Sequence, residues 1–255
     1  MEYKSMYMLA VKCWVTLEIT LIFGVCAIFY YIPGLSFVLE LGMSKVTGIK
    51  MPKRNYWETF LGWEMYKSVW KSRLVDIMKQ ARNGGEAQNV PLVTADGKKC
   101  VRLLDLLQVD RALVVYFGSC SCPVFMNKLN AFGELAQDYS DIVDFVVVYI
   151  EEAHPEDGWS FKNNFINVRK HRNQEERCLA AQKLQELNLP CRILVDTMED
   201  NANVAYGALP ERLYAIEEGK VAYVGGQGPL NSSMKAARAW LEEYREKNTF
   251  RRWTL

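Results

Sequence analysis

The chain has 255 residues, half of them apolar, and its 31 Lys and Arg against 30 Asp and Glu give a formal net charge of +1. This length holds one full domain with an appendage or two small domains. Because the charges balance and no basic patch alternates with aromatic residues, the sequence predicts no nucleic-acid partner.

An apolar segment near the N-terminus, Cys13–Leu39, contains one charge, Glu18. About 20 such residues span a bilayer as a helix, so we expect a transmembrane anchor at 13–39 after a short tail of residues 1–12. No A-x-A-like cleavage site closes the run, which argues against a signal peptide, and its length argues against a core helix. More basic residues follow the segment than precede it: Lys45, Lys50, Lys53 and Arg54 against Lys4 and Lys12. The positive-inside rule therefore places the rest of the chain in the cytosol.

The seven cysteines are scattered, apart from the close pair Cys120 and Cys122. This spacing argues against a secreted disulfide framework. One residue separates the pair and no second pair follows, so we expect no zinc site. The glycosylation acceptor Asn231-Ser232-Ser233 is expected to stay unmodified in the cytosol.

Residues 40–85 are predicted to form a juxtamembrane linker with an amphipathic helix between Arg54 and Ala81. Apolar residues recur there at helical spacing: Trp57, Phe60, Leu61, Trp70, Leu74, Ile77 and Met78. Residues 83–85, Asn-Gly-Gly, end the pattern. The helix could rest on the membrane surface or pack against the following domain.

Residues 86–255 alternate between expected strands and helices. A hairpin is predicted at 90–94 and 99–103, followed by an apolar strand at 111–117, a helix at 123–139 and a second apolar strand at 144–150. Two such strands around a helix form a right-handed βαβ unit.

The remaining elements follow a polar insertion at 151–174. A helix is expected at 175–188, a third apolar strand at 191–196, a short helical piece, a hairpin at 212–216 and 221–224 opened by Pro210, and a terminal helix at 232–247. This order predicts an α/β chain with a thioredoxin-like fold and one insertion after the second core strand.

The first strand-to-helix junction reads YFGSCSCPVFMNK, from Tyr116 to Lys128. Cys122 is placed at the start of the helix, where unpaired N–H groups and the helix dipole favour a thiolate. Cys120 is close enough to assist or resolve, although a direct disulfide across one residue would be strained. The alternative is that both are small buried apolar residues.

Both histidines of the chain, His154 and His171, lie in the insertion. They are the candidates for acid/base work near pH 7. Glu152 precedes His154 by two residues and would share its face in an extended segment, where it could orient the imidazole. Either histidine could instead be a solvated loop residue.

Five blocks of the sequence resemble signature blocks of the iodothyronine deiodinases: YFGSCSCP, YIEEAHPEDGWSFKNN, HRNQEERCLAAQ, LVDTM and YGALPERLYAIEEGKVAYVGGQGP. The resemblance covers roughly residues 91–244. It implies a membrane-anchored homodimer of thioredoxin-like fold in the endoplasmic reticulum or plasma membrane. Such an enzyme removes iodine from iodothyronines with a thiol cosubstrate, such as thioredoxin, glutaredoxin or glutathione, and with no bound cofactor or metal.

The resemblance also implies roles for single residues. Cys122, normally selenocysteine in the family and here either a natural cysteine or its replacement, would take the iodine. Further implied roles are a proton relay at His154 oriented by Glu152, substrate contacts at Trp159, His171, Glu211 and Gln227, and regeneration by Cys120 and Cys191. Cys191 could equally be a buried strand residue. Gln227 stands where the family usually carries Arg or Lys, and glutamine only hydrogen-bonds.

Three functions remain open at this point. The first is reductive deiodination, with inner- or outer-ring preference undecided. The second is a peroxiredoxin-like thiol peroxidase or disulfide reductase, and the third is a redox-inactive, hormone-binding membrane protein. The aromatic insertion with Trp159 and Phe161 favours the first, because an iodothyronine is an aromatic ligand.

Overall fold

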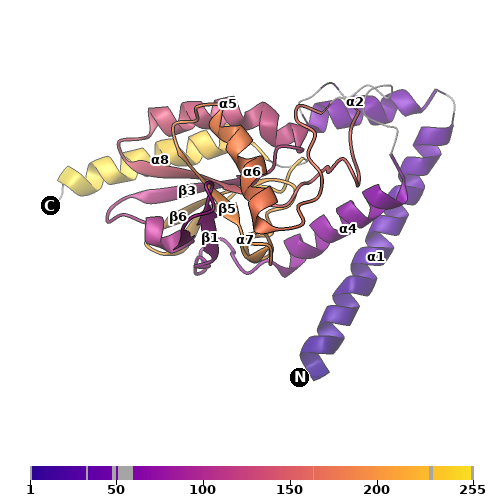
Figure 1. Ribbon diagram of the computed structural model, residues 1–255, viewed down its shortest axis with the longest axis horizontal. Helices are drawn as coiled ribbons and strands as arrows, with labels where there is room; N and C mark the ends of the chain where they lie inside the picture. Colours follow the sequence, from indigo (N-terminus) through magenta and orange to yellow (C-terminus); the bar gives the residue numbers. More distant parts are fainter. Residues whose placement is uncertain are drawn as a thin grey trace.

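The computed structural model describes residues 2–32, 34–47, 50, 60–162, 164–229 and 232–253. Helices surround a seven-stranded sheet, and helix α1 projects away from it (Figure 1). The strands are β1 (Pro91–Thr94), β2 (Cys100–Arg102), β3 (Ala112–Gly118), β4 (Val143–Tyr149), β5 (Arg192–Asp196), β6 (Arg212–Glu217) and β7 (Lys220–Val224). The helices are α1 (Glu2–Tyr31), α2 (Ser36–Thr47), α4 (Trp63–Met78), the 3-10 turn η1 (Leu103–Leu106), α5 (Pro123–Asp138), α6 (Gln174–Gln185), α7 (Asn201–Tyr206) and α8 (Met234–Trp253).

Strand β3 is an interior strand of the sheet, next to the middle strand β4 in the order β2-β1-β5-β4-β3-β6-β7. It runs parallel to β4 and antiparallel to β6, and all seven of its residues are buried. A continuous apolar run is what a strand covered on both faces requires. The prediction of a central apolar strand is therefore confirmed.

The connections are those of a thioredoxin-like fold. Strand β3, helix α5 and strand β4 form the predicted βαβ unit, and the antiparallel hairpin β6–β7 and helix α8 close the domain. Helices α5 and α8 pack against each other along the sheet (Figure 1). The Leu209–Pro210 peptide that leads into β6 is cis. The carboxyl ends of β3 and β4 meet at one edge of the sheet, where ligand sites of α/β proteins gather.

The apolar N-terminal segment forms helix α1, but its bounds differ from the predicted anchor at 13–39. Residues Ser5–Tyr31 are long and apolar enough to cross a membrane, with a mean hydropathy of 1.9 over their most apolar window. Little of that window is buried, unlike a core helix of a soluble protein. The helix ends at Tyr31 and cannot continue through Gly34, whose φ of +85° lies outside the helical region, and residues 36–39 belong to α2.

The predicted juxtamembrane helix is shorter than expected. Helix α4 covers Trp63–Met78, and the predicted start, with Arg54 and Trp57, lies outside the described residues. Leu61 adopts a positive φ and Gly62 is extended, so the helix cannot continue toward Phe60. Helix α4 packs against α1 on one side and α7 on the other.

Replacing Gly118 by alanine tests the close packing where β3 ends. A Cβ at this position would overlap the ring of Phe125, which is fully buried on α5. We expect Gly118→Ala to lower the free energy of unfolding by about 1–3 kcal/mol, because the ring can move only by disturbing the core. Denaturant unfolding in detergent measures the loss.

Gly42→Ala is the matched control. Gly42 lies in α2, and apart from the backbone of its own helix no atom lies within 4 Å of its Cβ position, so alanine there should leave the stability unchanged or raise it. Equal stability of Gly118→Ala and wild type would contradict the packing described for β3.

Candidate active site

Cys122 is the residue that caps the N-terminus of helix α5. Its backbone is extended, Pro123 is the first helical residue, and its carbonyl accepts the first helical hydrogen bond, from the Met126 N–H at 3.0 Å. Proline suits this position because the N–H it lacks would have no helical partner. The loop Ser119–Cys122 thus joins the carboxyl end of β3 to α5, as the sequence predicted.

Hydrogen bonds tie this loop to the segment that follows β4. The Ala153 N–H donates to Ser119 Oγ at 3.1 Å, the His154 N–H donates to Ser121 Oγ at 3.0 Å, and the Ser121 N–H donates to Glu152 Oε2 at 2.9 Å. The two serines that alternate with the cysteines therefore satisfy buried backbone groups of the neighbouring loop. They hold the two loops in one fixed arrangement.

Both cysteines of the junction are buried, and burial disfavours the expected thiolate in the form described here. Cys122 is only 1% exposed, and burial followed by the charge of Glu211 raises its pKa to about 12. The amides of Phe125 and Val124 and the charge of Lys128 favour the thiolate, although the sulfur closes no capping hydrogen bond. Removal from water outweighs these groups, so the thiol is protonated at neutral pH.

Cys120 behaves in the same way. Burial followed by the charge of Glu152 raises the pKa of its thiol to about 12. Its sulfur lies 3.7 Å from the carbonyl of Ala180 on α6, and its N–H donates to the hydroxyl of Tyr149 at 3.3 Å.

Glu152 is the centre of a buried polar network, but not with the partner that we expected. Its Oε1 accepts a hydrogen bond from the Tyr149 hydroxyl and lies 3.2 Å from His171 Nε2, without hydrogen-bond alignment. His171 Nδ1 in turn accepts from Arg177 Nε at 3.4 Å. The expected orientation of His154 by Glu152 is wrong. Residues 151–154 bend, and side chains two residues apart point to the same face only in an extended segment.

His154 lies instead among aromatic rings. Its ring centroid is 4.4 Å from that of Trp159 and 4.3 Å from that of Phe161. Burial lowers the pKa of the imidazole to about 3, so the ring is neutral. Its Nδ1 and the indole N–H of Trp159 are buried with no hydrogen-bond partner among the described residues. Unpaired buried polar atoms beside aromatic faces suit a ring ligand that carries polar substituents.

The insertion between β4 and α6 has no regular secondary structure in its described residues and folds over the junction. The Glu156 N–H donates to the Val168 carbonyl at 2.8 Å, and Asn164 Nδ2 donates to the Ser121 carbonyl at 2.6 Å. The insertion therefore contacts the loop that carries Cys122, and the thiol itself is buried in this form.

Glu211 follows the cis peptide and is fully buried. Its carboxylate is 3.1 Å from Lys128 Nζ on α5 and accepts from Ser232 Oγ at 3.0 Å. A Cβ on Gly228 would overlap this carboxylate, so glycine is required there. Burial, followed by the charges of Glu211 and Cys122, raises the pKa of Tyr116. Glu211 thus places a negative charge beside the Cys122 thiol, and its carboxylate oxygens are already bound by Lys128 and Ser232.

Gln227 has a structural partner in place of a ligand. Its Nε2 lies 2.6 Å from the Leu209 carbonyl, 3.0 Å from Ser72 Oγ and 3.1 Å from the Ser72 carbonyl. In the form described here, the amide therefore joins the β7 loop to α4 and to the cis turn. The substrate contact expected at Gln227 is not available without breaking these bonds.

Cys191 lies at the opposite end of the sheet from Cys122. It precedes β5, whose Arg192 lies beside Val146, which in turn lies beside Val115 in β3. Cys191 therefore lies near the position of Val115 along the strand direction. Between Val115 and Cys122 the chain passes three more residues of β3 and then the loop, so the two cysteines lie roughly 10 Å or more apart along the strands. Cysteines more than about 7 Å apart at Cα cannot be bridged without backbone movement. The expected resolving role of Cys191 therefore disagrees with the structure.

Several site residues were missed from the sequence. The polar residues Ser119 and Ser121 inside a buried turn, and Tyr149 at the end of an apolar strand, were signals that we did not use. Lys128, in the second turn of α5, was a third. In the part of the chain that the structure describes, no group of three His, Cys, Asp or Glu side chains could hold a metal ion.

The chain is similar to known proteins over most of its length. Residues 8–245 match the family described as iodothyronine deiodinase. The chain is 41% identical over 230 residues to the type II iodothyronine deiodinase of Bos taurus, a match that covers 81% of this chain and 83% of that protein. It is 42% identical over 184 residues to the thyroxine 5-deiodinase of Gallus gallus, covering 72% and 71%. A crystal structure of an uncharacterized conserved protein from Geobacillus kaustophilus is 22% identical, with a TM-score of 0.49, and covers 65% of this chain and 83% of that one.

The burial of His154 predicts a pH-dependent stability. The folded protein keeps this imidazole neutral down to a pH of about 3, whereas the unfolded chain binds a proton below about 6.5. The unfolded state therefore binds more protons in this window, and the free energy of unfolding falls as the pH falls. Between pH 7 and pH 5, His154 alone lowers the free energy of unfolding by about 2 kcal/mol.

His154→Phe keeps the aromatic contacts and removes the titrating group. Chemical unfolding at both pH values should show a smaller loss for the variant than for wild type. An equal loss in both proteins would mean that the imidazole is accessible to water in the folded state.

Proposed function

The chain belongs to the iodothyronine deiodinase family, and we propose that its reductive deiodination of thyroid hormones uses the thiolate of Cys122 as the nucleophile. The observation that carries this proposal is the placement of Cys122. It caps α5 at the carboxyl end of the interior strand β3, in a loop fixed by hydrogen bonds to the neighbouring loop. The backbone amides at the start of α5 and the positive charge of Lys128 both favour the negatively charged form of the Cys122 sulfur.

The chemical step transfers iodine from carbon to sulfur. The Cys122 thiolate attacks iodine along the C–I axis, an S–I bond forms, and the C–I electron pair remains on the ring carbon, which then takes a proton. A thiol cosubstrate attacks the sulfur of the sulfenyl iodide, releases iodide and a proton, and forms a disulfide with Cys122. A second thiol exchanges with that disulfide and returns Cys122 to its reduced form.

The proton for the ring carbon comes from the buried network around Glu152. Tyr149, Glu152 and His171 are linked to the Cys122 loop through the Ser121 N–H. His154 is neutral at pH 7 because burial lowers the pKa to about 3, so its proposed role is contact with the aromatic ring of the hormone. Trp159 and Phe161 complete that contact.

Thiol regeneration starts with Cys120 or an external thiol. Cys120 lies in the same loop, and thioredoxin, glutaredoxin or glutathione would supply the electrons. Homodimerisation belongs to the same proposal and rests on family membership.

Helix α1 is the proposed single membrane anchor, and the catalytic domain would face the cytosol at the endoplasmic reticulum or plasma membrane. One face of the helix carries large exposed apolar side chains, each between 54% and 62% exposed: Trp14, Leu17, Leu21, Val25 and Ile28. These residues recur every three or four positions, so they form one stripe that suits contact with lipid.

Iodide release tests the nucleophile. We expect Cys122→Ala to release no iodide from radiolabelled thyroxine with dithiothreitol in detergent, while the wild type does. Cys100→Ala, an exposed thiol on β2, is the control and should retain the wild-type rate, and so should Cys191→Ala. Hydrogen peroxide consumption by the wild type without iodide release would favour the peroxiredoxin-like alternative, and hormone binding without either reaction would favour a binding protein.

The glycosylation acceptor tests the topology. Asn231 lies outside the described residues, but its sequon remains usable wherever the domain is luminal. A cytosolic domain predicts no change in gel mobility on endoglycosidase treatment of protein made with microsomes. A glycan lost in Asn231→Gln would contradict the cytosolic assignment.

A further inference from the structure

One of the two ring nitrogens of His171 faces a group that can only donate. Nδ1 accepts a hydrogen bond from Nε of Arg177, on helix α6, at 3.4 Å. Guanidinium nitrogens have no lone pair to offer, so Nδ1 must present its own lone pair to Arg177. A neutral imidazole without a proton on Nδ1 carries it on Nε2, and an imidazolium, which donates from both nitrogens, could not make this bond. The contact with Arg177 therefore selects one tautomer of His171.

The proton of that tautomer lies beside the carboxylate of Glu152. His171 Nε2 is 3.2 Å from Glu152 Oε1, and the His171 side chain is only 2% exposed. The other tautomer would turn the lone pair of Nε2 toward the carboxylate, and two acceptors that face each other in a buried site repel. Nε2 makes no aligned hydrogen bond with any residue in the described ranges, so its proton is not committed to a structural contact.

With this tautomer, Glu152 is surrounded by donors. Oε1 accepts from the Tyr149 hydroxyl, and Oε2 accepts from the Ser121 N–H at 2.9 Å. The N–H of His171 Nε2 approaches Oε1 as the third donor. This arrangement suits a carboxylate, which only accepts hydrogen bonds.

Arg177 itself is held by groups outside this network. Its Nη1 donates to the Thr197 carbonyl at 2.6 Å and to Asp200 Oδ1 at 2.9 Å, and the residue is only 3% exposed. Because a guanidinium is planar and rigid, the bonds at Nη1 also fix the direction in which the Nε–H points. Thr197 and Asp200 follow strand β5, which lies beside β4. The loop after a third parallel strand thus sets the orientation of the His171 ring.

We propose that Arg177 is a positioning residue for deiodination, which keeps the His171 proton on Nε2 and leaves Glu152 as the group that accepts and returns a proton. The protons balance, because the Cys122 thiol loses one when it becomes a thiolate and the ring carbon gains one when iodine leaves. Glu152 and His171 then end the step in the state in which they began. This inference rests on the proposed function, in which the network around Glu152 supplies the proton.

Nuclear magnetic resonance of the full-length protein in detergent measures the tautomer directly. The chain has only two histidines, so isotope labelling of histidine nitrogen in untagged protein shows two imidazoles. His154→Phe then identifies the signals of His171. A ring nitrogen without a proton resonates well downfield of an N–H nitrogen, so we expect a downfield Nδ1 and a protonated Nε2. A proton on Nδ1 in the wild type would overturn the proposal.

Two substitutions of Arg177 separate the donor from the bulk of the side chain. Arg177→Met removes the donor, whereas Arg177→Lys keeps a group that only donates. We expect Arg177→Met to give a mixture of tautomers and to lower kcat for iodide release about tenfold with little change in KM, because a positioned proton relay speeds the chemical step. Arg177→Lys should retain the Nε2 tautomer and most of the rate.

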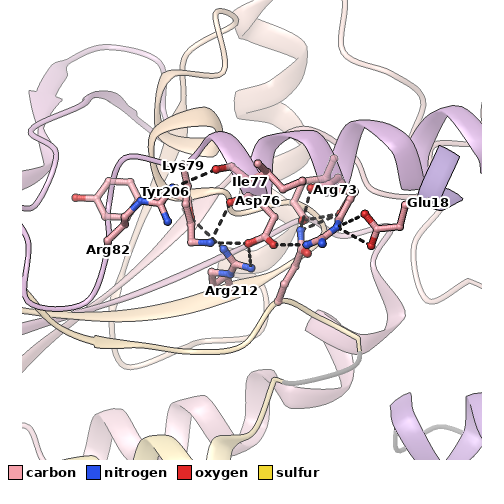
Figure 2. Close-up of polar contacts among 11 residues, drawn as sticks. Glu18, Arg73, Asp76, Ile77, Lys79, Arg82, Tyr206 and Arg212 are labelled. Carbon is pink, nitrogen blue, oxygen red and sulfur yellow. Dashed lines mark hydrogen bonds and ion pairs between the residues drawn. The ribbon is translucent and has the colours of Figure 1, made fainter. Parts of the chain in front are cut away.

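Arg212→Met is the matched control for the loss of a buried cation. Arg212 is also 3% exposed, and its guanidinium donates to Asp76 of α4 at 2.7 Å and to the Tyr206 carbonyl at 3.5 Å (Figure 2). Both Arg→Met substitutions leave a carboxylate without its partner, so both should lower the free energy of unfolding. Only Arg177→Met should change the tautomer of His171.

Each outcome decides the question. Wild-type kcat in Arg177→Met, with or without a change of tautomer, would overturn the proposal, and so would the same change of tautomer in Arg212→Met. A raised KM with wild-type kcat would also contradict it, because His171 would then serve hormone binding. If Arg177→Met does not fold, the tautomer of the wild type decides. If the wild type releases no iodide, the proposed function fails, while the resonance experiment still tests the selection of the tautomer by Arg177.

Discussion

The arrangement of the site depends on hydrogen bonds between two loops that follow adjacent parallel strands. The loop after β3 carries Cys122, the loop after β4 carries Glu152 and His154, and Ser119 and Ser121 join them through backbone amides. Because parallel strands end at one edge of a sheet, the two loops are neighbours whatever their sequences. The hydrogen bonds of the two serines fix the positions of the two loops, and with them the Cys122 thiol, the Glu152 carboxylate and the His154 imidazole.

At Cys122, burial and the charges at the start of α5 have opposite effects on the pKa of the thiol. The helix amides and Lys128 favour a negative sulfur, but complete burial favours the neutral thiol and dominates in the closed form. Access of water to the sulfur would therefore favour the thiolate.

Much of the fold could be predicted from the sequence, and the reason is that its core strands are short, apolar and bounded by clear turn residues. The central strand, the helix that starts at Pro123, the insertion and the hairpin after Pro210 all occur at the expected places within a few residues. The position of Cys122, the proposed nucleophile, could be predicted because a strand-to-helix junction is a local feature.

What could not be predicted depends on long-range geometry. The pairing of Glu152 with His171 in place of His154 follows from bends in the insertion, which have no periodic signal. The separation of Cys191 from Cys122 follows from strand register, and the raised pKa of Cys122 follows from its burial and from the charge of Glu211, which is distant in the sequence. The end of the apolar helix at Tyr31 was visible in residues 33–34, Pro-Gly, but the length of the uncharged run outweighed that signal.

The contacts of α4 change where the catalytic domain begins. From the sequence, residues 40–85 would be discarded as a linker when a soluble fragment is prepared. A fragment cut at residue 85 would leave Glu151 without Lys71, buried Arg212 without Asp76, and Gln227 without Ser72. The smallest fragment that retains these partners begins near residue 60, and such a fragment exposes the face of α4 that α1 covers in the intact chain. Loss of solubility on truncation would then come from that uncovered face, and substitutions of Tyr66 and Trp70 by polar residues are the place to repair it.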